Sequence, residues 1–227
     1  MSATDQFTLL GREAHRHWRA ERINWLVLTG IVLLLLLTIA GLWAVLYLQS
    51  VERPYVEVRG YRFADEATFQ EFLRQGDNRA RFAEFTTFLR ESDVDMELIP
   101  PQDLLRQGSD WLRIHEPPFA LPPREDWPNI VATLRLVRDE VVPNTGPVLV
   151  VSAYRTARYT RKVGGSATSH HRNFCSVDLV PKSNISRREL VNELQTMHVR
   201  IGAESRAGLG IYGDVRFHID TCGYRRW

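Results

Sequence analysis

The chain has 227 residues, with 29 Lys and Arg against 27 Asp and Glu, a formal charge of +2, and 44% hydrophobic residues. It is too apolar for a disordered chain, and 14 Gly and 11 Pro are too few for a fibrous one. The near-neutral charge argues against a dedicated nucleic-acid binder, which usually carries a strong basic excess. Two cysteines allow at most one disulfide, so the fold must rest on a hydrophobic core.

Residues 23–48 contain no charged side chain. A helix of this length spans roughly 39 Å, enough to cross a hydrocarbon core of about 30 Å with some tilt. Trp25, Trp43 and Tyr47 lie near its ends, where such rings prefer the lipid headgroups. The segment therefore predicts a transmembrane helix with the lipid bilayer as its partner. A buried soluble helix and a cleaved signal peptide are the alternatives; the apolar run is about twice a usual signal-peptide core, and no A-x-A site follows it.

Four arginines precede this segment and favour a cytoplasmic N-terminus: Arg12, Arg16, Arg19 and Arg22. We therefore expect a single-pass protein with a cytoplasmic tail over residues 1–22 and a transmembrane helix over 23–48. The remainder would lie outside the cytoplasm. It is expected to contain a stalk and helical segment over 49–93 and the main domain over 94–227.

In chain order, residues 49–62 alternate in polarity and predict a stalk or a first strand. Two helices follow, separated by a turn at residues 76–78, because phenylalanine and leucine recur at helical spacing. These apolar positions are Phe69, Phe72, Leu73, Phe82, Phe85, Phe88 and Leu89. Residues 94–128 hold too many prolines for a long helix and are expected to wrap the domain surface as an ordered connection.

Pro128 suits the first turn of a helix, and the apolar positions up to Val141 predict one that ends before Pro143. A short β-branched strand follows at Val148–Val151. It delivers residues 152–155 to a strand-to-loop junction, a common place for functional side chains.

The strongest chemical signal lies in residues 164–180 and 214–220. Strand alternation places His218 and Asp220 on one face, and Ser176 and Asp178 on one face of the other segment. Two such strands side by side, with His171 on the entering loop, would bring two imidazoles and a carboxylate to one point, which is typical of a catalytic zinc site. Each histidine alone is weak evidence, and His170 cannot point inward together with His171 in an extended segment.

The motifs in this order resemble the M15 group of zinc peptidases. They are Ser152-x-Tyr154-Arg155, Val163-Gly164-Gly165, Ser169-x-His171 with Asp178, and Phe217-His218-Ile219-Asp220. The group contains D-alanyl-D-alanine carboxypeptidases and dipeptidases and peptidoglycan endopeptidases, and its fold also occurs in the Hedgehog signalling domain. The resemblance covers roughly residues 95–227. It implies an α+β fold with a small central antiparallel sheet and flanking helices.

The resemblance implies one Zn²⁺ per chain, held by His171, Asp178 and His218. Arg155 would hold a substrate carboxylate or the developing oxyanion, and Tyr154 and Ser169 would contact substrate. The substrate would be an amide bond in peptidoglycan stem peptides or cross-links, next to a bacterial inner membrane whose periplasmic side carries the domain. The catalytic base would be Asp214 or Asp220, although Asp214 lies four residues before the last ligand, where the family usually places it three before.

Two positions depart from the family pattern, since Phe174 and Ser176 stand where glycine and alanine are common. A phenylalanine beside the metal would narrow or reshape the substrate groove.

Two alternatives to a peptidase remain open. Loss of the base would leave a non-catalytic member that binds cell-wall peptides or a membrane partner. The second alternative is an assembly protein in which the helices of residues 65–92 carry the partner contact. Cys175 and Cys222 flank the site and are open to three interpretations, which are a disulfide, two buried thiols or a metal-ligand role.

Overall fold

The computed structural model describes residues 3–50 and 53–227, which form two compact units, Met1–Arg53 and Pro54–Trp227. The first unit is helix α1 (Ala3–Ser50), whose segment Asn24–Tyr47 has a mean hydropathy of 2.6 and is long and apolar enough to cross a membrane. The side chains described there are exposed. Residues 1–2 of the expected tail and 51–52 of the expected stalk lie outside the described residues, as do the side chains of the four N-terminal arginines.

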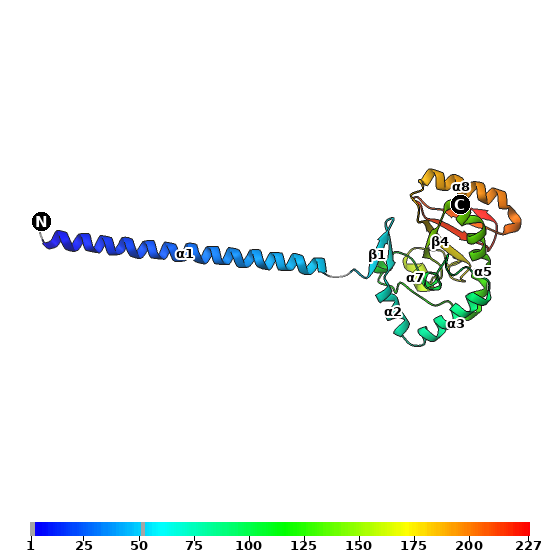
Figure 1. Cartoon of the computed structure of the whole chain (residues 1–227), viewed down its shortest axis with the longest axis horizontal. Helices are drawn as coiled ribbons and strands as arrows, with labels where there is room; N and C mark the ends of the chain where they lie inside the picture. The colour runs from blue at the N-terminus through cyan, green and yellow to red at the C-terminus, as the bar shows by residue number, and fades with distance from the viewer. Residues whose placement is uncertain (1–2, 51–52) are drawn as a thin grey trace. The chain divides into compact units, whose positions relative to one another are not determined.

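A five-stranded sheet forms the centre of the second unit, in the order β3-β4-β6-β5-β7. Its strands are β3 (Val148–Ser152), β4 (Ser176–Pro181), β5 (Gly208–Ile211), β6 (Phe217–Asp220) and β7 (Arg225–Arg226). All neighbours are antiparallel except β5 and β7. Helices α5 and α8 flank this sheet in Figure 1. The expected mixture of helices and a small, mainly antiparallel sheet is therefore present.

Residues 54–64 do not form a stalk. Strands β1 (Tyr55–Val58) and β2 (Tyr61–Ala64) form a separate hairpin, with a tight turn at Arg59 and Gly60, both of which have positive φ. Side chains of the hairpin pack with two residues of the central sheet, Val151 and Val180. The strand alternative is the correct one, because Tyr61 and Phe63 find an apolar surface to cover.

The predicted helix pair is confirmed as α2 (Glu66–Arg74) and α3 (Asn78–Glu91). The Asp65 carboxylate accepts from the Thr68 main-chain N at 2.8 Å and caps the start of α2. Phe85 and Leu89 of α3 are fully buried and belong to the same hydrophobic core as the sheet. The boundary expected between residues 93 and 94 is therefore not a boundary in the packing, since apolar side chains on both sides share one core.

The proline-rich segment contains only short helical turns, as expected: η1 (Pro101–Leu105), α4 (Trp111–Ile114) and η2 (Arg124–Asp126). Gln107 anchors it from a buried position. Its side-chain Oε1 accepts from the main-chain N of Thr156 at 2.9 Å, and its Nε2 donates to the Pro117 carbonyl at 2.9 Å. The segment is thereby joined to the loop that carries Arg155.

The helix after the proline-rich segment does not end before Pro143. It continues from α5 (Trp127–Leu136) through a π-helical turn, η3 (Val137–Val141), into α6 (Val142–Thr145). A π turn widens the hydrogen-bond ladder, so the proline ring and its missing N–H are accommodated. The chain then turns at Gly146, whose φ is +78°.

The remaining helices are α7 (Ala157–Lys162), α8 (Arg187–Ile201) and the short turn η4 (Ala203–Ser205). Cys175, directly before β4, forms a disulfide with Cys222, which follows β6. The structure thus selects the disulfide among the three interpretations of the cysteines. The bond ties together the ends of the two strands that carry Asp178 and His218.

A core truncation in α3 tests whether residues 54–227 unfold as one unit. Leu89→Ala removes a fully buried side chain and should lower the free energy of unfolding by about 2–5 kcal/mol. The measurement is thermal unfolding of the full chain in detergent, followed by tryptophan fluorescence. A single, shifted transition is expected, whereas the exposed control Glu91→Ala should unfold like the wild type. A second, unshifted transition from the sheet would contradict the shared core.

Candidate metal centre

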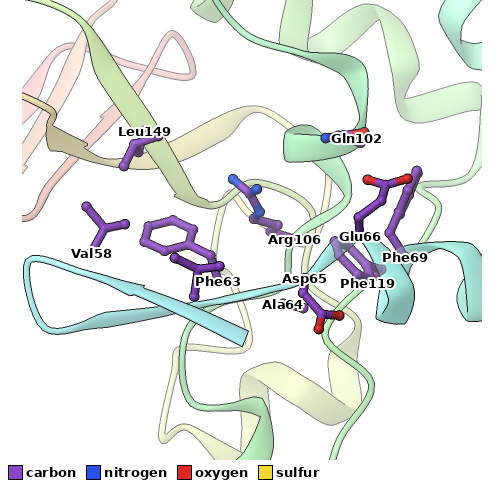
Figure 2. Close-up of a pocket in the computed structure, with 11 residues that line it drawn as sticks. Val58, Phe63, Ala64, Asp65, Glu66, Phe69, Gln102, Arg106, Phe119 and Leu149 are labelled. Carbon is purple, nitrogen blue, oxygen red and sulfur yellow. The ribbon is translucent and has the colours of Figure 1, made fainter. Parts of the chain in front are cut away.

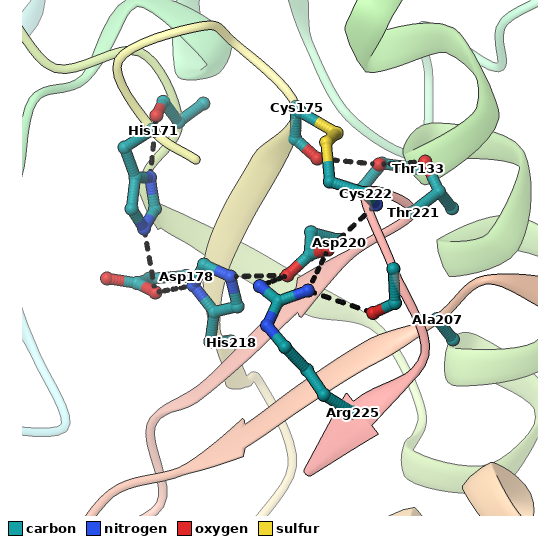
Figure 3. A network of polar contacts seen from close by, with 12 residues as sticks. Thr133, His171, Cys175, Asp178, Ala207, His218, Asp220, Thr221, Cys222 and Arg225 are labelled. Carbon is teal, nitrogen blue, oxygen red and sulfur yellow. Dashed lines mark hydrogen bonds and ion pairs between the residues drawn. A yellow bond between two sulfur atoms is a disulfide. The ribbon is translucent and has the colours of Figure 1, made fainter. Parts of the chain in front are cut away.

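Three side chains converge at one face of the central sheet. Asp178 on β4 pairs in register with His218 on β6, and His171 reaches the same point from the loop before β4. One ligand atom from each lies within 4.8 Å of the others, and all three residues are buried. Figure 3 shows the two rings on either side of the Asp178 carboxylate. The geometry therefore joins the three residues that the sequence singled out.

The hydrogen bonds of His171 determine which nitrogen faces the cluster. Its Nδ1 lies 2.7 Å from the Ala153 carbonyl oxygen, which can only accept a hydrogen bond. Nδ1 therefore carries the proton, and the lone pair is on Nε2, 3.2 Å from Asp178 Oδ1. Burial lowers the pKa of His171 to about 4, so the ring is neutral near pH 7.

His218 has the opposite arrangement. Its Nε2 lies 2.9 Å from Asp220 Oδ2, and its Nδ1 lies 3.0 Å from Asp178 Oδ1. The carboxylate of Asp220 accepts the Nε2 proton and leaves the Nδ1 lone pair toward the cluster in the neutral ring. Burial acts to lower the pKa of His218, but hydrogen bonds that the protonated ring donates to Asp178 and Asp220 outweigh it and raise the pKa, so a metal ion at Nδ1 would displace a proton.

Asp178 is fully buried but is held as a carboxylate. Burial alone would raise its pKa, but His171 and Arg155 bring it well below its usual range. Arg155 donates to Asp178 Oδ2 through one terminal nitrogen, and Tyr212 donates to Oδ1 at 3.2 Å. The guanidinium is itself fixed, because its Nε donates to the Ser152 hydroxyl at 2.6 Å and to the Gln107 carbonyl at 2.9 Å.

This donor set fits Zn²⁺. With both rings neutral, two nitrogen lone pairs and a carboxylate oxygen face one point, and such acceptors repel one another unless a cation lies between them. Two imidazoles and one carboxylate also form the ligand set of many catalytic zinc sites. His171, Asp178 and His218 would hold the ion, with Ala153 and Asp220 fixing the two tautomers.

A second set of contacts holds Asp220 in place. Arg225 donates to both of its oxygens, at 2.6 Å and 3.0 Å, and the Cys222 main-chain N donates at 2.8 Å. Burial acts to raise the pKa of Asp220, but hydrogen bonds from His218 and Arg225 lower it to about 2. The arginine reaches the carboxylate across Gly208, where a Cβ atom would lie 2.7 Å from the guanidinium. The missing side chain on β5 therefore makes room for the ion pair.

A cavity of about 230 Å³ opens beside the cluster. It is lined by Asp178 and Arg155 and by two side chains of the 212–216 loop between β5 and β6, Tyr212 and Arg216. Arg155 Nη1 makes no hydrogen bond within the described residues, and the Arg216 guanidinium stacks on the Tyr212 ring at 4.1 Å. The cavity thus presents two cations next to the buried carboxylate, which suits an anionic group of a substrate.

Tyr154 and Ser169, which the sequence predicts to contact substrate, do not line this cavity. Tyr154 packs edge-on against Phe174, and Ser169 lies in the loop before His171, where its main chain bonds to Ser166 and Arg172. Phe174 does not narrow the groove: its φ is +55°, which breaks the strand, and its ring is buried against Phe85. His170 lines a separate hollow beside the disulfide, in agreement with the expectation that it does not point inward.

The two candidate bases have different surroundings. Asp220 is fully buried and bonded to His218 and Arg225, which makes it a positioning group for the imidazole. Asp214 is exposed, in the 212–216 loop, and accepts a hydrogen bond from the Tyr61 hydroxyl. It does not line the cavity described above, although Tyr212 and Arg216 of the same loop do.

Sequence reasoning missed Gln107, Tyr212, Arg216 and Arg225. Gln107 bonds to Thr156 across 49 residues and Tyr212 bonds to Asp178 across 34, so no local pattern marks these two as functional. The alternation of Gly208 and Gly210 on a short strand is the one available signal, because glycine in a strand often marks the close approach of another group. Here that group is the Arg225 guanidinium at Gly208 and the Trp227 ring at Gly210.

Arg225→Ala tests the support behind His218. Without the guanidinium, Asp220 loses two hydrogen bonds and holds the imidazole less firmly, so zinc affinity should fall roughly 10–100-fold. The measurement is competition for zinc with a coloured chelator, using the full chain in detergent. The neighbouring exposed residue offers a matched control, Arg226→Ala, which should bind like the wild type. Equal affinity in both variants would show that the ion pair does not support the site.

The comparison with protein families gives one match, to the model described as Peptidase M15, over residues 105–220. Comparisons with curated proteins and with solved structures found no match. The matched region covers more than half of the chain and contains Arg155 and the three residues of the metal cluster. Peptidases of this family are in general zinc-dependent. Together with the cluster, the match shows that the chain belongs to the peptidase M15 family.

Proposed function

We propose that this protein is a membrane-anchored zinc peptidase that cleaves amide bonds of peptidoglycan stem peptides or cross-links. The observation that carries the proposal is the buried cluster of His171, Asp178 and His218, in which one ring nitrogen of each imidazole faces the same carboxylate oxygen. Zinc bound there would lower the pKa of a water molecule toward about 7 and polarise the carbonyl of the scissile bond. Side chains around the ion would orient the substrate and transfer the proton.

Substrate orientation is assigned to the cations of the cavity. Arg155 uses one terminal nitrogen and Nε to hold Asp178, Ser152 and Gln107, and its Nη1 is left for the substrate. Arg216 lines the same cavity. Two guanidinium groups match the terminal carboxylate of a peptide or the oxyanion that develops on its carbonyl. A D-alanyl-D-alanine terminus has such a carboxylate, which supports an activity of the carboxypeptidase or endopeptidase type.

Proton transfer is assigned to Asp214. Asp220 is unsuitable as a base, because Arg225, His218 and the Cys222 main chain already occupy its oxygens. The Asp214 carboxylate lies in the loop that also carries Tyr212 and Arg216 to the cavity, and Asp214 is exposed. It would take the proton from the attacking water and pass it to the leaving amine.

The membrane part of the proposal rests on α1. Its segment Asn24–Tyr47 has the length and composition of a membrane span, and the chain continues from it into the peptidase unit. Insertion with residues 1–22 in the cytoplasm of a bacterium would place residues 54–227 on the periplasmic side of the inner membrane, next to the cell wall. The Cys175–Cys222 disulfide agrees with an oxidising compartment of this kind.

One observation favours a second function, a domain that binds wall peptides without cutting them. Asp214 does not line the cavity beside the metal cluster, and its carboxylate is engaged by Tyr61. A binding domain needs the cations of the cavity but no proton acceptor. The two functions therefore differ in the consequence of losing Asp214.

Zinc content is the first test. The full chain in detergent, freed of loosely held metal, should contain about one zinc per molecule by elemental analysis, because three protein ligands converge at one place. His171→Ala and His218→Ala should lose it. The adjacent control, His170→Ala, should retain zinc, since that side chain lines a different hollow. Wild-type protein without zinc would rule out the peptidase.

Turnover separates the two functions. Asp214→Asn should lower kcat on muropeptides roughly 10²–10⁴-fold if Asp214 is the base, while zinc content and peptide affinity stay unchanged. Chromatography of digested muropeptides gives the rate, and calorimetry gives the affinity. Asp139→Asn is the control, because Asp139 is paired with Arg138 and does not line the cavity. A wild type that binds muropeptides without cutting them would support the binding function instead.

A further inference from the structure

The hairpin of β1 and β2 contacts the catalytic unit although it lies outside the matched family region of residues 105–220. It is the first element after α1, since β1 begins at Tyr55. The family match assigns it no role. Its contacts reach the 212–216 loop, which contributes two side chains to the cavity.

Tyr61 of β2 makes the closest contact. Its hydroxyl donates to Asp214 Oδ2, and its ring lies 5.7 Å from the Arg216 guanidinium. The same guanidinium lies 4.1 Å from the Tyr212 ring, and the Tyr212 hydroxyl donates to Asp178. Hairpin, loop and metal cluster therefore form one continuous set of contacts.

The hairpin is held firmly enough to act as a support. Tyr61 and Phe63 are both buried and pack with Val151 and Val180 of the central sheet. At the turn, the Arg59 guanidinium donates to the Ser183 carbonyl and, at 3.3 Å, to the Ile185 carbonyl. Figure 2 shows the position of Phe63 in the hairpin, whose ring points toward Leu149 and the Arg106 guanidinium. The Tyr61 hydroxyl thus has a fixed place relative to β3 and β4.

We propose that Tyr61 is a positioning residue for Asp214, so that the hairpin, and not only the family region, completes the catalytic site. The inference rests on the proposed function, in which Asp214 is the base. Without the hydroxyl, the Asp214 carboxylate would lose its fixed orientation within a surface loop. Phenylalanine retains the ring that packs on the sheet and removes only this hydrogen bond.

Few charged or titratable groups act on Asp214. Burial acts to raise its pKa, but the Tyr61 hydroxyl, the main-chain N of Arg216 at 2.9 Å and the Arg216 charge together lower it. On the other side of this hydrogen bond, burial, the Asp214 carboxylate and the negative charge of Asp178 raise the pKa of Tyr61. Loss of the Tyr61 hydroxyl should therefore move the pKa of Asp214 upward.

The experiment compares Tyr61→Phe with wild type, using the zinc-loaded full chain in detergent. Zinc content and KM should be unchanged, kcat should fall roughly tenfold, and the acid limb of the kcat/KM profile should move to higher pH. The matched control is Tyr55→Phe on β1, whose hydroxyl makes no hydrogen bond within the described residues. It should behave like the wild type.

Thermal unfolding gives a readout that needs no activity. Because the folded-state pKa of Asp214 lies below the unfolded one, its contact with Tyr61 contributes stability above the unfolded pKa of about 4, and this is lost as pH falls through the folded pKa. Wild type should therefore have a higher Tm than Tyr61→Phe at pH 7, and the difference should narrow at acid pH.

The outcomes separate the two proposals. An active wild type, with Tyr61→Phe indistinguishable from Tyr55→Phe in kcat and acid limb, would overturn this inference and leave the peptidase function intact. A zinc-loaded wild type without turnover would overturn both the peptidase function and the role of Tyr61. In that case, the Tm difference would report only that the hydrogen bond stabilises the fold.

Discussion

The register between β4 and β6 is the constraint on which the site depends. It sets Asp178 beside His218 and, two residues along each strand, Ser176 beside Asp220. Because side chains alternate between the faces of a strand, a slip by one residue would move the carboxylate to the opposite face from the imidazole. The apolar residues between them, Val177 and Ile219, are fully buried in the core. Packing of the apolar face therefore holds the polar face in alignment.

The neighbouring strand β5 also contributes to the alignment of the site. Gly208 and Gly210 on β5 stand next to Asp220 and His218 in register, and their missing side chains give space to Arg225 of the edge strand β7 and to Trp227, which follows it. The candidate ligand His218 is thus backed by β5 and by residues 225–227. The proline-rich segment adds support from a distance, since Gln107 accepts a hydrogen bond from the arginine that holds Asp178.

The sequence predicted much of this because two of the three candidate ligands, Asp178 and His218, sit in strands whose alternation is visible in the residues themselves. It also located both α2 and α3, whose phenylalanines recur at helical spacing. The helix through Pro143 could not be foreseen, because the π turn that accommodates the proline has no distinct residue pattern. Phe174 was misplaced for a similar reason: a phenylalanine with positive φ runs against its local preference. Tyr61 contacts Asp214 across 153 residues, and local patterns do not report such a contact.

The disulfide has a consequence for the support behind His218. Cys222 donates its main-chain N to Asp220, so the turn that the bond fixes is also part of the support behind His218. A newly made chain in a reducing compartment would have two thiols at these positions and a turn restrained only by weaker contacts. In that state Asp220 would be held less firmly against His218.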